Sequence, residues 1–301
     1  MENFFRDRLW LVYTILAALS WAIWGILTKY ISDSISPYTY HILFTIGMLF
    51  SLPFVIYRIK NKKVNIKGIF LGTCTGVLAV IGNITVFQSL KLGGQASVVI
   101  PLSNLYPLIT ILVALLIFRE KLSWINGLGI LIIIPAVIIL SGQSQIFNDP
   151  SGFFQSLGLK TWLLFAFLSM LLFGLFSASQ KVTTNYLSAE WSYISFIASS
   201  VMVSVCFIAL NLVNFGAVQS TLLIGSLTGL LDGLGVLAIY SAYQVKGKAS
   251  QVSPIASALQ QLFTLLLAIT FLKERLSFVE FTGIGLAILG LWFLLLEKKK
   301  I

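Results

Sequence analysis

The stretch from Leu90 to Ser123 reads LKLGGQASVVIPLSNLYPLITILVALLIFREKLS, and the stretch from Tyr243 to Ser277 reads YQVKGKASQVSPIASALQQLFTLLLAITFLKERLS. The second stretch is a diverged copy of the first, and the agreement is too long to arise by chance. The chain is therefore an internal duplication. The matched pairs are Gly94 with Gly247, Ala96 with Ala249, Ser97 with Ser250 and Pro101 with Pro254, all 153 residues apart, and Glu120 with Glu274, 154 apart.

Composition indicates that the solvent of this chain is lipid, because 58% of its residues are hydrophobic and only 10% are charged. Runs of roughly 18 to 25 apolar residues, each able to cross a hydrocarbon core of about 30 Å, recur between short polar breaks. In lipid such runs must be helical, because every backbone polar group has to be satisfied within its own segment. The ten predicted helices are Leu9–Ile31, Tyr38–Tyr57, Ile69–Ser89, Ala96–Phe118, Trp124–Leu140, Leu159–Gln180, Trp191–Val213, Leu222–Tyr243, Ala249–Leu272 and Phe278–Leu296.

The lysines and arginines predict the orientation of these helices. Most of the 20 basic residues fall in the segments that share a side with the N-terminus, which places both termini in the cytoplasm. Each copy holds five helices, an odd number, so the second copy must enter the membrane from the opposite side. We expect an all-α integral membrane protein of two inverted five-helix repeats, residues 1–146 and 159–301, joined by the loop 147–158.

A polar face follows the predicted helix Ala249–Leu272, where Ser250, Ser253, Ser257 and Gln260 recur at spacings of three or four residues. Such a face should avoid lipid and could line a central cavity, although each polar group could instead join two helices. Aromatic, amide and hydroxyl side chains elsewhere could complete the lining. The predicted substrate-binding residues are Trp21, Trp24, Asn83, Ser103, Asn104, Tyr106, Gln180, Tyr240, Ser257 and Gln260.

Asp232 is the carboxylate at the centre of an apolar run, where a charge costs roughly 2.5 to 3.5 kcal/mol. Its repeat partner is Ala79, so the fold alone does not require it. It could couple transport to a proton or a sodium ion, act as counter-ion for a substrate amine, or serve as a protonated structural acid. Pro101 and Pro254 occupy matched positions, and each removes a helical hydrogen bond, so we expect a hinge at each or a simple bend. Pro107 and Pro135 have no repeat partner.

Other residue types predict less chemistry. His41 is expected at a membrane interface, and Gly72, Gly76, Gly225, Gly229 and Gly233 have the spacing of helix-packing contacts. No metal site or cofactor is expected, because the single histidine and the two cysteines form no ligand set. The distribution of basic residues over membrane ends argues against a nucleic-acid partner.

The chain resembles the EamA family of the drug/metabolite transporter superfamily. The likeness rests on the aromatic-to-lysine ends WAIWGILTK and FGLFSASQK, the GGQASVVIPLSNLYPL and GKASQVSPIASALQQL helix starts, and the FREKLS and LKERLS loops. It implies ten helices in two inverted repeats, a cavity lined by the first, third, fourth, sixth, eighth and ninth helices, and peripheral fifth and tenth helices. Relatives of this kind are associated with export of amino acids and other metabolites, drug efflux, and movement of sugars or nucleotide sugars.

The expected function is therefore secondary-active transport of a small organic metabolite, outward by family resemblance, through alternating access in a bacterial or archaeal inner membrane. The alternatives are a multidrug exporter, a sugar or nucleotide-sugar carrier, and a lipid-modifying enzyme or scramblase. The sequence has no GxxxxGK[ST] motif for ATP hydrolysis and no HExxH motif, which disfavours an enzyme. The expected partners are the solute, the lipid bilayer and a coupling ion, and the sequence defines no oligomeric state.

Overall fold

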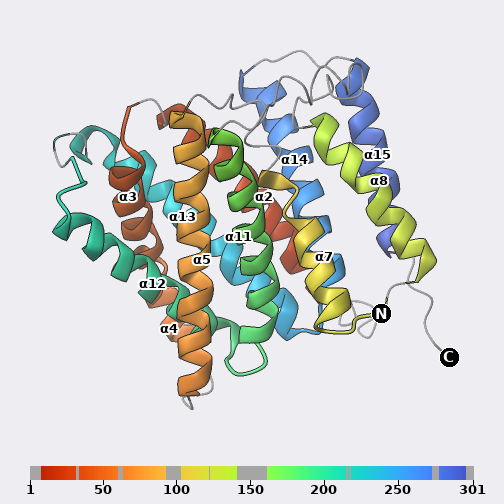
Figure 1. The fold of residues 1–301 in the computed structure, drawn as a ribbon, viewed down its shortest axis with the longest axis horizontal. Coiled ribbons are helices and arrows are strands. Elements are labelled where there is room, and N and C mark those ends of the chain that lie inside the picture. The colour runs from red at the N-terminus through yellow and green to blue at the C-terminus, as the bar shows by residue number, and fades with distance from the viewer. Residues whose placement is uncertain are drawn as a thin grey trace. The chain divides into compact units, whose positions relative to one another are not determined.

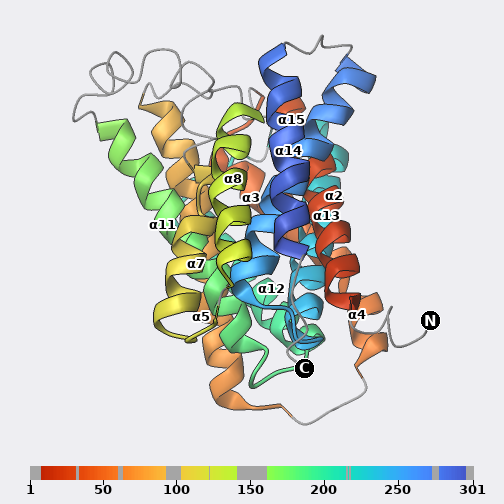
Figure 2. The same cartoon turned by 90° about the vertical axis from the view of Figure 1, so that its right-hand side faces the viewer.

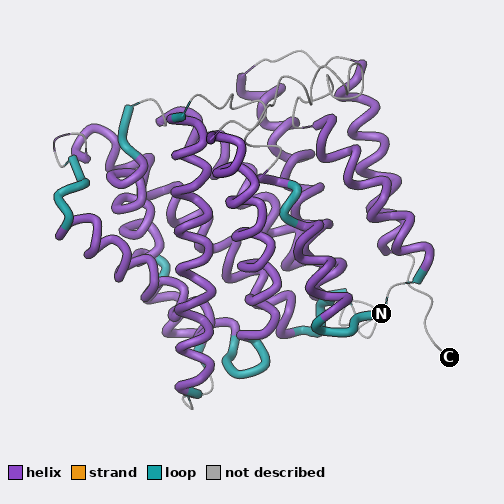
Figure 3. The backbone as a smooth tube through the Cα atoms, in the orientation of Figure 1, coloured by secondary structure: helices purple, strands orange, loops and turns teal. Residues whose placement is uncertain are grey.

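The computed structural model describes residues 8–31, 34–59, 64–92, 103–121, 123–140, 161–214, 216, 218–272 and 278–295. These residues form helices and short loops without a strand (Figure 3). Every one of the ten predicted apolar runs contains helix. The helices are α2 (Leu9–Ile31), α3 (Pro37–Phe50), α4 (Leu52–Arg58), α5 (Ile66–Lys91), α7 (Pro107–Leu116), α8 (Trp124–Leu140), α11 (Thr161–Thr183), α12 (Ala189–Ala209), α13 (Val218–Gln244), α14 (Ala249–Leu272) and α15 (Phe278–Leu295).

Six helical segments in the described residues are long and apolar enough to cross a membrane. The helix that carries the serine and glutamine stripe, α14, is not among them. Ten crossings and cytoplasmic termini therefore remain predictions from the sequence. The six segments are Leu9–Thr28, Pro37–Arg58, Ile66–Val86, Thr161–Thr183, Ala189–Ala209 and Thr221–Gln244, and shorter apolar helices cover Pro107–Leu116, Trp124–Ala136 and Phe281–Gly290.

Two predicted helices are interrupted, and a proline follows each interruption. The run Tyr38–Tyr57 divides at Ser51, because Pro53 has no N–H with which to continue the helical ladder. The Ser51 hydroxyl donates to the carbonyl of Met48 at 2.6 Å. In the run Ala96–Phe118, the helix α7 begins at Pro107, directly after a turn, while Pro101 lies outside the described residues.

The chain divides into two compact units. Unit 1 comprises Met1–Val80 and Ala178–Gly247, and unit 2 comprises Ile81–Ser177 and Lys248–Ile301. Each unit combines segments from both predicted repeats, so the units are not the repeats themselves. The boundaries of the repeats remain a prediction from the sequence.

Unit 1 is built around α13, which packs against α2, α3 and α12 (Figure 1). Glycines permit this close approach. Gly229 lies against the backbone carbonyl of Phe44, and a Cβ on Gly225 would lie 2.6 Å from Leu43 Cδ1. On α5, a Cβ on Gly72 would lie 2.7 Å from Ser195 Cβ of α12. The glycine spacing thus serves helix packing, as in membrane helices generally.

Polar contacts join α3 to α12 within unit 1. His41 Nε2 lies 3.2 Å from the carbonyl oxygen of Ser200, and Thr45 and Ser204 share a hydroxyl hydrogen bond of 2.9 Å. The imidazole of His41, which the sequence predicts at a membrane interface, is buried between Phe44, Phe207 and the Ser200 carbonyl. A buried histidine with this carbonyl partner holds two helices together.

Unit 2 is organised by a pair of helices, α8 and α15, with α14 against both and against α7 (Figure 2). Asn126 Nδ2 of α8 donates to the carbonyl of Phe293 on α15 at 3.3 Å. A Cβ on Gly290 would lie 2.6 Å from Ile133 Cγ1, so the two helices approach closely there as well.

Alanine substitution at a packed glycine and at an open one should separate two effects on stability, the loss of close helix contact and the gain in helix propensity. We expect Gly229→Ala to lower the yield of folded protein and its melting temperature sharply, because the new Cβ meets a backbone carbonyl that cannot rotate away. Gly285→Ala is the control, since a Cβ there meets nothing within 4 Å, and it should leave stability equal or higher by up to about 1 kcal/mol. Size-exclusion profiles and thermal unfolding in detergent measure both. Equal behaviour of the two variants would contradict the packing account.

Candidate functional site

Asp232 lies near the middle of α13, and its side chain is partly exposed. The indole N–H of Trp21 on α2 faces this carboxylate without reaching hydrogen-bond geometry. Trp21 Nε1 also sits over the next turn of α13, where a Cβ on Gly235 would lie 2.5 Å from it. No lysine, arginine or histidine among the described residues pairs with Asp232. The carboxylate is therefore available to a cation or a proton.

The structure distinguishes Trp21 from Trp24, although the sequence suggested the same role for both. Trp24 Nε1 donates to the Tyr40 hydroxyl at 3.0 Å, and that hydroxyl also bonds Thr28 Oγ1 at 2.8 Å. Trp24 is thus committed to joining α2 and α3. Trp21 keeps a buried N–H with no partner in the described part of the chain.

Two further predicted residues of unit 1 carry buried polar atoms that lack partners among the described residues. Gln180 is 1% exposed and its Nε2 makes no hydrogen bond, and Tyr240 is fully buried with an unpaired hydroxyl. Buried polar groups are satisfied in the great majority of cases, so each unpaired group needs an explanation. Together with Trp21, they give unit 1 three buried donors that have no partner among the described residues.

In unit 2, two predicted residues are engaged in contacts between helical segments. Ser103 bonds Ser169 of α11 at 2.5 Å, and Ser169 in turn donates to the carbonyl of Ala166 at 2.7 Å. The hydroxyl of Ser257 on α14 donates to the carbonyl of Asn104 at 3.4 Å. These contacts match the alternative in which hydroxyls join helices.

Two further predicted residues of unit 2, Asn104 and Tyr106, lie near Pro254. Asn104 lines a small cavity with Pro107 and Pro254, of about 20 Å³ and with almost entirely apolar walls, which is room for about one water molecule. The Tyr106 ring meets Phe173 edge-on at 6.5 Å, and its hydroxyl lies close to Ser253. Pro254 itself lies inside α14, as predicted, next to this void.

Asn83 and Gln260 are half-buried, and neither forms a hydrogen bond with the described residues. Both amides are therefore free to meet water or a solute. Asn83 and Gln260 belong to unit 2, whereas Asp232 belongs to unit 1.

Tyr40 and Tyr193 have no distinguishing pattern in the sequence, yet both lie within electrostatic range of Asp232. Tyr193 is fully buried on α12, and its hydroxyl bonds Ser51 at 2.9 Å, at the break between α3 and α4. A tyrosine on an apolar helix face has no distinguishing signal in a single sequence.

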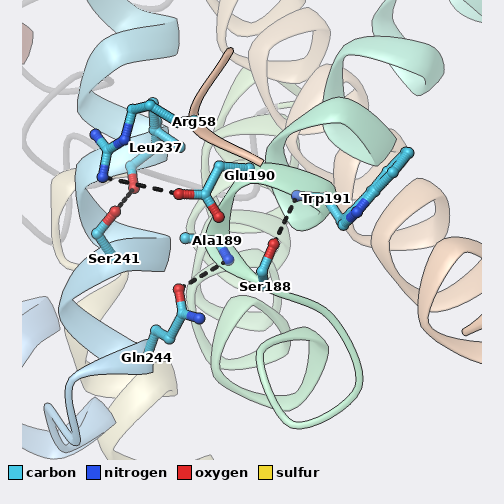
Figure 4. A network of polar contacts seen from close by, with 8 residues as sticks. All are labelled: Arg58, Ser188, Ala189, Glu190, Trp191, Leu237, Ser241 and Gln244. Atoms are coloured by element: carbon cyan, nitrogen blue, oxygen red, sulfur yellow. Dashed lines mark hydrogen bonds and ion pairs between the residues drawn. The ribbon is translucent and has the colours of Figure 1, made fainter. Parts of the chain in front are cut away.

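A polar network ties three helix ends together in unit 1 (Figure 4). Arg58 at the end of α4 forms an ion pair of 3.7 Å with Glu190, in the first turn of α12. Gln244 at the end of α13 accepts a hydrogen bond of 3.0 Å from the N–H of Ala189. This end carries basic residues that the sequence assigns to the cytoplasm. Within the described ranges, no three histidine, cysteine, aspartate or glutamate side chains come together as a metal site.

The sequence model of the EamA-like transporter family matches residues 8–142 and 160–296. An uncharacterized transporter of Archaeoglobus fulgidus is 25% identical over 291 residues, which cover 95% of this chain and 98% of the relative. An uncharacterized protein of Methanocaldococcus jannaschii is 26% identical over 132 residues, 44% of this chain and 95% of that protein. A crystal structure with 15% identity covers 97% of this chain and 99% of its own, with a TM-score of 0.74, so the two share a fold.

The two tryptophans should respond differently to loss of their N–H groups. We expect Trp24→Phe to destabilise the protein by about 0.6 to 2 kcal/mol, the range for hydrogen bonds between membrane helices, because Tyr40 loses a donor. Trp21→Phe removes an N–H that has no partner and should leave thermal unfolding unchanged. Tyr40→Phe combined with Trp24→Phe should cost less than the sum of the single changes. A larger loss for Trp21→Phe than for Trp24→Phe would contradict this assignment.

Proposed function

Because the chain belongs to the EamA-like transporter family of the drug/metabolite transporter superfamily, we propose that it carries a small polar or amphiphilic organic metabolite out of the cell by alternating access. It is a multi-pass protein of a prokaryotic cell membrane and a transporter rather than an enzyme. The observation that carries the proposal is Asp232, a carboxylate near the middle of α13 that faces the Trp21 indole and pairs with no basic side chain among the described residues. A membrane protein that holds a carboxylate without a basic partner at this depth needs a use for it.

We assign the substrate site in unit 1 to Asp232, Trp21, Gln180 and Tyr240, while Asn83, Asn104, Tyr106 and Gln260 stay predictions from the sequence. The first four supply one acceptor and three donors, which suits a solute with both charged and hydroxyl or carbonyl groups. Trp24 serves this site by fixing α2 against α3. Asp232 is the candidate for coupling to a proton or a sodium ion, or for pairing with a substrate amine.

The two-repeat organisation is part of the proposal. It is supported by the paired residues of the sequence, by two family matches of similar length, and by a relative that covers about half of this chain. In alternating access, two inverted copies present the same site first to one side of the membrane and then to the other.

Transport and its dependence on Asp232 can be measured together. A thermal-shift screen of purified protein against metabolite pools identifies the solute, since a ligand at 100 times its dissociation constant adds about 2.7 kcal/mol of stability. In proteoliposomes, we expect Asp232→Asn to abolish gradient-driven accumulation of that solute while the variant folds normally. Glu190→Gln, which removes another unit 1 carboxylate, is the matched control. Unchanged gradient-driven flux in Asp232→Asn would remove Asp232 from the mechanism.

The inverted arrangement predicts opposite sidedness for two exposed positions that pair in the repeats. Ser34 and Tyr186 lie 152 residues apart, the offset that also relates Lys29 to Lys181. We expect a cysteine at Ser34 to react with a membrane-impermeant maleimide added outside intact cells, and a cysteine at Tyr186 to react only after the membrane is opened. Labelling of both positions from the same side would overturn the inverted-repeat topology.

A further inference from the structure

The chain passes between its two compact units at three places. Two of these passages lie inside the helices α5 and α11. The third lies between Gly247 and Lys248, in the short non-helical link from the end of α13 at Gln244 to the start of α14 at Ala249. Among the three, this link is the one without helical hydrogen bonds across it.

On the unit 1 side of the link, Lys181 holds the end of α13. Its ammonium donates to the carbonyl of Gly247 at 2.7 Å and lies 3.5 Å from the carbonyl of Tyr243. It also sits 5.6 Å from the centre of the Tyr243 ring. Carbonyls at the end of a helix lack internal partners and carry partial negative charge, so a cation stabilises them. The Gly247 N–H is fixed as well, by a bond of 2.9 Å to the carbonyl of Ala242.

On the unit 2 side, Glu120 holds the start of α14. Its carboxylate accepts from the N–H groups of Ala249 at 3.1 Å and Ser250 at 3.0 Å, and from the Ser250 hydroxyl at 2.6 Å. Glu120 reaches this position from the loop that follows α7. An anion at the N-terminus of a helix satisfies unpaired N–H groups and interacts favourably with the helix dipole.

The link is therefore bounded by a cation on the carbonyl side and an anion on the amide side. We propose that Lys181 and Glu120 are positioning residues for transport: they stiffen the two helix ends, so that the change between inward-facing and outward-facing states is concentrated in the Gly247–Lys248 link. This inference rests on the proposed function, because it assigns the two residues to the motion of a transporter. Hinges are short segments at element ends that absorb backbone rotation while the flanking bodies move intact.

The sequence duplication accounts for these residue types. The positions that match Lys181, Gly247, Ala249, Ser250 and Glu120 in the other copy hold Lys29, Gly94, Ala96, Ser97 and Glu274. Their side chains lie outside the described residues, so the pairing is a fact of sequence alone. It places a lysine, a glycine and a glutamate at the same three points of both copies, which are among the best-matched points of the chain.

Pulsed electron–electron resonance on the full-length protein in nanodiscs tests the proposal without a solute. Spin labels at Tyr186→Cys in unit 1 and Trp124→Cys in unit 2, with Cys74 and Cys206 replaced by serine, report the distance between the units. We expect Lys181→Met and Glu120→Gln each to broaden the distance distribution, and Lys181→Arg to restore it because the guanidinium can still donate to the Gly247 carbonyl. Glu190→Gln removes a carboxylate whose ion pair is with Arg58 and not with either end of the link, and it should leave the distribution unchanged.

Flux provides the second readout. With the solute from the thermal-shift screen, the positioning variants should lower the maximal transport rate about tenfold with little change in half-saturation, the pattern expected when a step after binding is slowed. Unchanged distances in both variants, or equal broadening by Glu190→Gln, would overturn the proposal, as would loss of solute binding in step with flux. Absence of flux in the unaltered protein would instead defeat the proposed function, while the distance measurement still decides the role of the two residues. Should Lys181→Met or Glu120→Gln fail to fold, Lys181→Leu and Glu120→Ala make the same comparison, because each also removes the charge.

Discussion

Close contact between helix backbones is the constraint on which unit 1 depends. In lipid, apolar side chains gain little by leaving the solvent for one another, so helices associate through packing and a few hydrogen bonds. Gly225 and Gly229 let α13 meet α3 at backbone distance, and the His41 and Thr45 contacts fix α3 against α12. Once these helices are locked, Asp232 is held on a rigid element, as a binding or coupling group must be.

The polar side chains of the membrane-spanning part fall into two groups with different uses. Four residues form hydrogen bonds with neighbouring segments: Ser103, Ser257, Trp24 and Tyr193. Trp21, Gln180 and Tyr240 keep buried polar atoms that the described residues do not satisfy. A transporter needs both, because the first group determines where the second group stands. A polar group that already bonds a neighbouring helix is engaged, whereas an unpaired polar group can bind a solute.

The helices could be predicted from the sequence because the length of apolar runs is a direct physical requirement of the bilayer. Thus Leu9–Ile31, Trp124–Leu140 and Ala249–Leu272 have the predicted bounds. The break at Ser51 was missed, because Pro53 can either bend a helix or end it. The roles of Trp21 and Trp24 could not be separated, since a hydrogen-bond partner such as Tyr40 is set by tertiary packing. Lys181 and Glu120 recur in both copies of the sequence, but their hydrogen-bond partners beside the end of α13 and the start of α14 are set by tertiary structure.

The brevity of the connection between α13 and α14 has a mechanical consequence. From Asp232 to the last residue of α13 the helix rises about 18 Å, and only four residues separate that end from α14. A connection so short has no loose coil over which to spread a change in direction, so any rotation between α13 and α14 is taken up by the few backbone bonds of these four residues.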